Sequence, residues 1–513
     1  MTSDFAEWLK RLDIRYKSAM ISTFIFGIIS QGMGLFNKLS VHDDVMYYGV
    51  GATYTSGRWM LHILKRLEEK FYGDGHYSLP AFNGFLAIFL IGLSVCLLIR
   101  LLDIRSMFFC IFISGIMVSF PVITCLFAFV FTIHFYMIAL FFGLLGACFV
   151  CRSEKWYVWM AGIVLMGAST GIYQAFYPLT ITAVLFFMID TVVKSDDVRS
   201  MLRKTVTAGA GGLLAMVFYF AANKMYLAAH HAVLSDYKGV NNMGKSSLRE
   251  YLSRAKDAYE EFFFPEKIGS KYFMYPGRIS LLYKVCLVLS IVLCIILFVR
   301  VLRRSRIHAL LLVLLLAVIP LAVNFIDVMA GRKEVHSLMV YAQVLPFVFL
   351  IWAVENVHFE KRLPQRVITA VAAVIASALL VMYCRVDNKC YLKAIFAQQE
   401  AISYLTTLIT QIKETEGYKD EYPVAFVNAK HISDTSVKPG DDGALSDITY
   451  NTYRFDVIGY INSYSWLKFM QQWTGYAPTV VEGFDELEEV KKMPSYPDDG
   501  SIQIIDDTVV VKF

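Results

Sequence analysis

The sequence is poor in charged residues for its length. Only 18% of its 513 residues are Asp, Glu, Lys or Arg, whereas 57% are hydrophobic. Soluble domains usually contain about 25% charged and about 45–50% apolar residues, so this balance excludes an ordinary soluble protein. The net charge of +5 comes from short basic clusters between apolar runs, which is not the pattern of a nucleic-acid-binding surface. The chain is expected to be a polytopic membrane protein that lies in a lipid bilayer and binds no nucleic acid.

The sequence also lacks the common signatures of soluble enzymes. It has no Gly-rich phosphate loop, no zinc-ligand spacing and no nucleophile elbow. Its nine cysteines lie almost all in apolar runs or at their ends, and none of them has metal-ligand spacing. Cysteine is therefore expected to carry no function here.

Eleven apolar segments are predicted to cross the bilayer as helices, each of about 20 residues. They lie near residues 20–36, 81–100, 106–120, 123–150, 157–172, 178–193, 205–228, 280–299, 308–325, 337–354 and 367–384. Pro121 is predicted to form the turn between the third and fourth spans. The first residues are polar and too long for the start of a cleavable signal peptide, so the first span is expected to remain.

The loops between these segments predict an orientation. Every second loop is basic: KRLDIRYK, RLLDIR, CRSEK, VKSDDVRSMLRK, RVLRRSR and FEKRLPQR. Because basic loops stay in the cytoplasm, the N-terminus is expected inside. With eleven spans, the long loops 37–80 and 229–279 and the whole of residues 386–513 are then expected outside.

Residues 386–513 differ in character from the membrane domain, residues 1–385. They contain an amphipathic helix, AIFAQQEAISYLTTLITQIKE, and an apolar strand, PVAFVNA. The last run, SIQIIDDTVVVKF, is typical of two strands joined by a turn at Asp506 and Asp507. A small extracytoplasmic α/β domain is predicted.

The first outer loop is predicted to contain an interfacial helix. From Ser56 onward, large apolar residues recur at helical spacing, opposite a charged face. The apolar residues are Trp59, Met60, Ile63, Leu64, Leu67 and Phe71, and the polar ones are His62, Lys65, Arg66, Glu68 and Glu69. The apolar stripe is expected to lie at the level of the lipid headgroups. The loop 229–279 combines charge and aromatics in a similar way and is also expected to hold interfacial helices.

Asp43 and Asp44 follow the first predicted span directly. A carboxylate beside a membrane is unfavourable unless it meets water, a metal or a partner. The pair is a candidate for a general base with a neighbour that orients it, or for a site of a divalent metal such as Mg²⁺ or Mn²⁺. Simple hydration, or capping of the helix that follows, explains the same residues without chemistry.

Two further outer positions carry side chains suited to an anionic sugar substrate. Arg58, in the motif SGRW, fits a phosphate through two parallel hydrogen bonds, although an interfacial anchor beside Trp59 is the alternative. In STGIYQAFYP, Tyr173, Gln174 and Tyr177 offer the hydrogen bonds and ring faces that sugar hydroxyls use. A span turn with the usual aromatic belt gives the same residues.

The turn NFIDVMAGRKEVHS breaks the charge trend because it is basic on the outer side. It brings together Asp327, Arg332, Lys333 and His336. This cluster suits a lipid-linked phosphate whose chain lies in the bilayer, and the alternative is anchoring to headgroups. The acidic pair, Arg58, the amide of Gln174 and this basic turn are thus all expected on one side of the membrane. This arrangement predicts a site for a membrane-anchored anionic substrate.

These features together resemble the GT-C superfamily of polytopic glycosyltransferases. Within it, the stretches HDDVMYYGVGATYTSGRW, TGIYQAFYP and GRKEVHSLMVYAQVLPF resemble the serotype-converting glucosyltransferases of the Gtr type. The resemblance covers roughly residues 1–385 and is looser over the C-terminal domain.

The resemblance implies a polyprenyl-phosphate sugar as the donor, usually undecaprenyl-phosphate-glucose, supplied by a donor synthase and a flippase. The implied acceptor is a surface polysaccharide such as O-antigen, or its lipid-linked precursor, outside a bacterial cytoplasmic membrane. Asp43 or Asp44 would be the base, and Arg58 or Arg332 would offset the charge that grows on the donor phosphate. A divalent metal is compatible with this chemistry but not required by it.

Two other classes of function remain as alternatives. A flippase or transporter of a lipid-linked sugar predicts charges at mid-membrane depth and paired internal repeats, whereas these charges lie at the outer rim. A non-catalytic envelope scaffold would use the outer domain to bind a partner. Within the enzyme class, the transferred sugar could instead be mannose, galactose or aminoarabinose, because each would require the same acidic residues.

Overall fold

The computed structural model describes residues 12–40, 44, 53–73, 77–235, 246–265, 278–330, 335–359, 362–429 and 466–513. The chain divides into two compact units. The membrane unit comprises Met1–Phe36 and Tyr48–Asn388, and the C-terminal unit comprises Asn37–Tyr47 and Lys389–Phe513.

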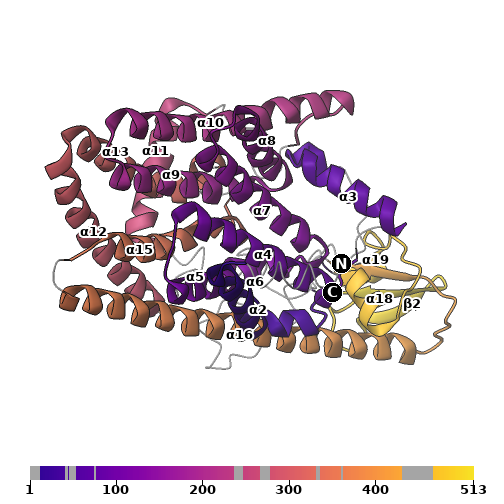
Figure 1. Ribbon diagram of the computed structural model, residues 1–513. Helices are drawn as coiled ribbons and strands as arrows, with labels where there is room; N and C mark the ends of the chain where they lie inside the picture. The colour runs from indigo at the N-terminus through magenta and orange to yellow at the C-terminus, as the bar shows by residue number, and fades with distance from the viewer. Residues whose placement is uncertain are drawn as a thin grey trace, which may run out of the picture. The chain divides into compact units, whose positions relative to one another are not determined.

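The membrane unit is helical. The helices that overlap the predicted spans are α2 (Ile14–Phe36), α4 (Pro80–Leu102), α5 (Met107–Ser119), α6 (Pro121–Phe127), α7 (Val130–Arg152), α8 (Trp156–Ile172), α9 (Tyr177–Lys194), α10 (Val198–Ala229), α12 (Arg278–Arg304), α13 (Arg306–Val323), α15 (Leu345–Asn356) and the first part of α16 (Arg362–Glu414). The other helices are α3 (Trp59–Tyr72), α11 (Leu248–Phe263) and α14 (Phe325–Ala330), with 3-10 turns η2 (Thr53–Ser56), η3 (Gln174–Phe176), η7 (Ser337–Met339) and η8 (Tyr341–Val344). Helix α7 packs against both α4 and α8, and α9 packs against α13 (Figure 1).

Eight helices in the described part of the chain are long and apolar enough to cross a bilayer, and the bent pair α5–α6 makes a ninth. Two more apolar helices, Trp156–Ile172 and Tyr341–Asn356, are shorter. Each of the eleven predicted spans overlaps one of these helices. The prediction of a polytopic helical membrane protein is therefore confirmed.

The predicted turn at Pro121 is instead a 42° bend between α5 and α6. Proline has no N–H, so the carbonyl four residues earlier loses its helical partner. That carbonyl, on Met117, accepts a hydrogen bond from Tyr341 Oη at 2.7 Å, and the next one, on Val118, accepts from Gln31 Nε2 at 3.1 Å. The broken helix is thus satisfied by the protein, as membrane-embedded backbone requires.

The basic loops meet at one end of the helices, here called the Asp103 end. Three arginines there donate to backbone carbonyls at or beside helix C-termini: Arg152 for α4, Arg304 for α9 and Arg300 for α15. The last carbonyls of a helix lack partners and carry partial negative charge, so these contacts are favourable.

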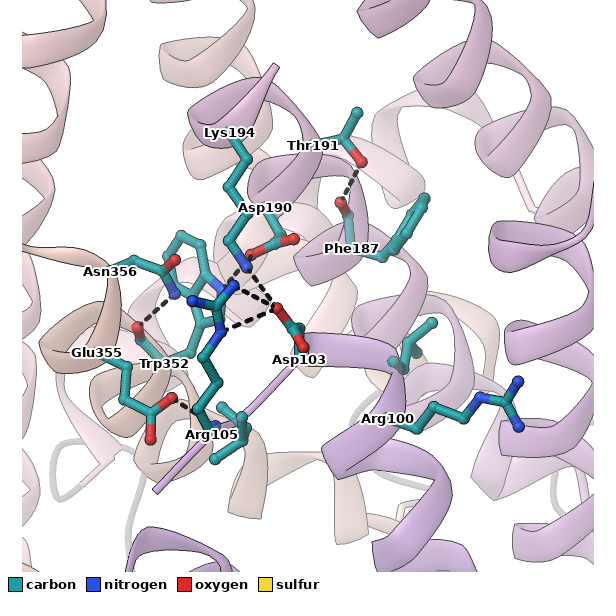
Figure 2. Close-up of polar contacts among 12 residues, drawn as sticks. Arg100, Asp103, Arg105, Phe187, Asp190, Thr191, Lys194, Trp352, Glu355 and Asn356 are labelled. Atoms are coloured by element: carbon teal, nitrogen blue, oxygen red, sulfur yellow. Dashed lines mark hydrogen bonds and ion pairs between the residues drawn. The ribbon is translucent and has the colours of Figure 1, made fainter. Parts of the chain in front are cut away.

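Figure 2 shows a polar network at the Asp103 end. Asp190 accepts a hydrogen bond from Trp352 Nε1 at 2.8 Å and pairs with Lys194 at 2.7 Å. Lys194 also lies 3.6 Å from Asp103, and Glu355 accepts two backbone N–H groups at the start of α5. Because these groups satisfy one another, we interpret the network as structural.

The C-terminal unit contains the predicted sheet. Its strands are β1 (Val424–Val427), β2 (Ile502–Ile505) and β3 (Thr508–Lys512), in the order β1-β3-β2, with β1 parallel and β2 antiparallel to β3. Asp506 and Asp507 have φ of 48° and 53°, as a two-residue hairpin turn with two left-handed residues requires. Helices α18 (Trp466–Thr474) and α19 (Glu488–Lys492) belong to the same unit. Helix α16 is continuous and contains both the last predicted span and the predicted amphipathic helix.

Candidate functional site

The turn between α8 and α9 is hydrogen-bonded to the segment that precedes α3. Gln174 donates from Nε2 to the Ser56 carbonyl at 2.8 Å and to Tyr219 Oη at 3.2 Å, and Tyr219 Oη donates to the Gly57 carbonyl at 3.2 Å. Gly57 has φ of 77°, a conformation that favours glycine. The SGRW and GIYQAF motifs, far apart in the sequence, therefore form one site, here called the Arg58 site.

Arg58 is held by two aromatic rings. Its guanidinium carbon lies 5.3 Å from the centre of the Tyr173 ring, and Tyr173 stacks on Tyr136 with 4.3 Å between ring centres. Arg58 Nη1 also lies 3.5 Å from Tyr136 Oη. A cation over a ring face is stabilised by the ring quadrupole, so the guanidinium has a defined position, as bidentate contact with a phosphate requires.

Trp59 anchors α3 to α8. Its ring packs with Ala168 and Tyr219 in one buried cluster. A Cβ atom on Gly171 would lie only 2.6 Å from the indole, so the ring can approach α8 this closely only because residue 171 is glycine. Helix α3 is thereby fixed relative to the Arg58 site.

Helix α3 turns part of its polar face toward the protein. The helix is confirmed over Trp59–Tyr72, and its buried residues are Trp59, Leu61, His62 and Lys65. Leu67 and Phe71, two members of the predicted apolar stripe, are 48% and 84% exposed. Apolar residues on the outside suit a helix bordered by lipid. The same arrangement buries two polar side chains, those of His62 and Lys65.

Two charged side chains of α3 meet the first turns of α7. Lys65 is 4% exposed, and its Nζ lies 5.7 Å from the centre of the Phe131 ring. Glu68 Oε1 lies 3.0 Å from His134 Nε2. Burial, and then the positive charge of Arg58, lower the pKa of Lys65 to about 8. Lys65 was not singled out from the sequence, because its helical spacing places it among solvated charges.

An aromatic cluster flanks this face of α3. His62 Nδ1 lies 2.7 Å from Tyr226 Oη, and Tyr226 stacks on His230 with 4.4 Å between ring centres. Tyr54 contacts both histidine rings. Burial, and then Arg66, lower the pKa of His62 to about 4, so this imidazole is neutral at pH 7. Partly exposed rings with polar edges combine apolar contact with hydrogen bonding, which suits a saccharide.

A second polar cluster joins α11 to the turn after α13. Gln343 Nε2 donates to Glu261 Oε1 at 2.8 Å and to Asn324 Oδ1 at 3.1 Å, and Asn324 Nδ2 donates to the Ala258 carbonyl at 2.9 Å. Asp327 lies in α14 and is 1% exposed. Glu261 was not singled out from the sequence, because its burial depends on the packing of α11 against α13 and α14.

An apolar groove of about 380 Å³ adjoins this cluster, since Phe262, which follows Glu261, lines it. Its walls come from α11, α12, α13 and α15 and include Ser290, Cys294 and Phe298. A groove of this composition between membrane helices suits a hydrocarbon chain.

Asp44 belongs to the C-terminal unit. Its carboxylate forms an ion pair with Lys38, whose Nζ also donates to the Asp44 backbone carbonyl at 2.8 Å. Asp44 is 2% exposed. Asp43 lies outside the described residues, and within the described ranges no three His, Cys, Asp or Glu side chains are placed to share a metal ion. The Mg²⁺ or Mn²⁺ site considered for Asp43 and Asp44 stays a prediction.

The remaining predicted residues differ in their surroundings. Tyr177 is buried and donates from Oη to the Gly212 carbonyl at 3.1 Å, away from the Arg58 site. Tyr173 Oη donates to the Leu338 carbonyl at 3.4 Å, next to the turn that holds His336. Arg332 and Lys333 lie outside the described residues.

The fold and these polar clusters define a polytopic helical membrane protein with an amphiphilic site at one end of its helices. Residues 32–347, more than half of the chain, match the family model described as glucosyl transferase GtrII. The chain belongs to this family and is a membrane glycosyltransferase, as the resemblance predicted. Comparisons with curated proteins and with solved structures gave no match. The matched range includes α3, the Gln174 turn, Glu261 and Asp327.

Proposed function

We propose that the protein transfers glucose from a polyprenyl-phosphate donor to a hydroxyl group of a surface polysaccharide or lipid-linked glycan, outside the cytoplasmic membrane. The observation that supports the donor most directly is Arg58, fixed by Tyr173 and Tyr136 within the range that matches the glucosyltransferase family. A fixed guanidinium is the side chain best suited to a phosphate ester.

The positions of the basic loops support an outward-facing reaction. Arg152, Arg300 and Arg304 gather at the Asp103 end, and basic ends of membrane helices lie in the cytoplasm. The Arg58 site is at the other end of α8 and α9, so it would face outward. The N-terminus would then be inside and the C-terminal unit outside.

The chemistry is a direct displacement at the anomeric carbon. The acceptor oxygen forms a bond to this carbon while the bond from the carbon to the phosphate oxygen breaks, and the electron pair of that bond stays on the phosphate. A carboxylate takes the acceptor proton. Asp44 is paired with Lys38, so Asp43 is the proposed base. One displacement inverts the anomeric configuration.

The groove and the polar clusters supply contacts for the rest of the substrates. The isoprenoid chain of the donor would lie in the groove lined by Cys294 and Phe298. Asp327 and His336 are the proposed contacts to sugar hydroxyls, whereas Gln174, committed to Ser56 and Tyr219, shapes the site.

Purified protein in liposomes with polyprenyl-phosphate-[¹⁴C]glucose and a glycan acceptor tests this proposal. The expected result is acceptor-dependent release of polyprenyl phosphate together with labelled glycan. Movement of the intact donor between leaflets, with no release, would contradict the transferase and favour a flippase. Labelling from a nucleotide sugar alone would contradict the lipid donor.

A further inference from the structure

Arg58 and Lys65 place two positive charges on one part of the protein. Lys65 is almost completely buried, and its electrostatic partners include Arg58. Both side chains reach toward the first turns of α7, where Arg58 contacts Tyr136 and Lys65 contacts the Phe131 ring. Two like charges brought together in a site of low polarity repel each other, and an anion bound between them would reduce this repulsion.

No carboxylate within the described residues lies at ion-pair distance from Lys65. The acid one turn along the helix, Glu68, contacts His134 at 3.0 Å, and its charge raises the pKa of Lys65 less than burial and Arg58 lower it. A buried ammonium with no carboxylate at ion-pair distance is unfavourable by several kcal/mol, an order of magnitude that structural packing alone seldom sustains. A bound anion at Lys65 would reduce this penalty.

We infer that Lys65 is a second phosphate-binding residue beside Arg58, and that it acts mainly on the charge that develops as the sugar leaves. This inference rests on the proposed function. The donor phosphate is a diester and carries one negative charge, which Arg58 matches. When the bond from the anomeric carbon to the phosphate oxygen breaks, that oxygen keeps the electron pair and the phosphate becomes a monoester with a second charge. A cation that meets this second charge stabilises the transition state more than the bound donor.

The pH dependence follows from the groups around Lys65. These are Arg58, Glu68 on the same helix, and His134 and Tyr136 on α7. With a pKa lowered to about 8, the ammonium is protonated at pH 7 and loses its proton as the pH rises through 8. Binding of a dianion favours the protonated form, so affinity for a phosphate monoester should fall between pH 7.5 and about 9.

Kinetics separate this role from a structural one. Lys65→Met keeps most of the length of the side chain and removes its charge, and Lys70→Met is the matched control because Lys70 is exposed on the same helix. Lys65→Met is expected to lower kcat by at least about tenfold with little change in the donor KM. Arg58→Met is expected to raise the donor KM. Lys70→Met should match the wild type, and Lys65→Arg should recover part of kcat.

The decisive experiment measures binding of undecaprenyl phosphate and of uncharged undecaprenol to purified protein in detergent. The wild type and Lys70→Met should prefer the phosphate, and Lys65→Met should lose most of this preference while its thermal unfolding stays near that of the wild type. An unchanged preference in Lys65→Met would overturn the inference and leave the proposed function standing. No preference in the wild type would overturn both. If Lys65→Met does not fold, the wild-type affinity between pH 7.5 and 9 decides, because a flat profile contradicts a titrating lysine.

Discussion

The guanidinium of Arg58 lies 5.3 Å from the centre of the Tyr173 ring. These residues belong to the first loop and to the turn between α8 and α9, two motifs separated by more than a hundred residues. The hydrogen bonds from Gln174 to Ser56 and from Tyr219 to Gly57 hold the two segments together. Positioning of a donor phosphate would therefore depend on residues that do not touch it.

The ring of Tyr173, more than its hydroxyl, should matter for donor binding. Tyr173→Ala removes the surface under Arg58 and is expected to raise the donor KM by roughly 5- to 30-fold, as loss of a partly desolvated cation–π contact of about 1–2 kcal/mol predicts. Tyr173→Phe keeps the ring and should stay close to the wild type. Initial rates at varied donor concentration measure both. Equal impairment of the two variants would show that the hydroxyl, not the ring, is needed.

The two acids of the first loop should fail in different ways. Asp43→Asn is expected to abolish turnover without lowering stability, because only the proton acceptor is lost. Asp44→Asn removes the carboxylate that neutralises Lys38, and it should destabilise the C-terminal unit by roughly 1–3 kcal/mol. Thermal unfolding and single-turnover transfer measure the two effects. Adding Lys38→Met to Asp44→Asn should cost less than the two single changes summed, and strict additivity would argue against the pair.

Filling the apolar groove should weaken use of a long-chain donor. Cys294→Trp places an indole where the isoprenoid chain is proposed to lie, so the donor KM should rise by about tenfold or more. Val288→Trp is the control, because Val288 is 60% exposed on the same helix. A donor with a shortened chain should be affected less than the full-length one. Identical kinetics for Cys294→Trp and Val288→Trp would place the chain elsewhere.

The contact between Gly171 and Trp59 should be sensitive to a single methyl group. Gly171→Ala puts a Cβ 2.6 Å from the indole and must displace α3, at a cost of about 1–3 kcal/mol. Transfer activity should fall because Arg58 immediately precedes α3. Gly209→Ala is the control, since its nearest neighbour is the end of Met188 at 3.7 Å. Unfolding temperature and activity of the two variants check this, and normal activity for Gly171→Ala would contradict the positioning role of α3.

Much of the membrane fold follows from local patterns in the sequence. The spans are long apolar runs, and the turn at Asp506 and Asp507 is a local signal that requires no tertiary information. The bend at Pro121 could not be predicted from the sequence in the same way, because the chain there is held by hydrogen bonds from Tyr341 and Gln31, which lie far away in the sequence.

The candidate site could be predicted from the sequence only in part, for the same reason. Arg58 and Gln174 could be selected as polar residues beside spans. Lys65 could not, because helical periodicity separates a polar from an apolar face without saying which one meets the protein. The ion pair between Asp44 and Lys38 likewise depends on the folded structure and not on a local sequence pattern.

Asp43 is proposed to serve transfer of glucose from a lipid-linked donor to an outer glycan. The first measurement is of glycan composition and donor level in cells that carry the wild type or Asp43→Asn at equal membrane abundance. The variant is expected to lose one glucose substituent per repeat of the surface glycan while polyprenyl-phosphate-glucose accumulates. An unchanged glycan in the variant would contradict this proposal.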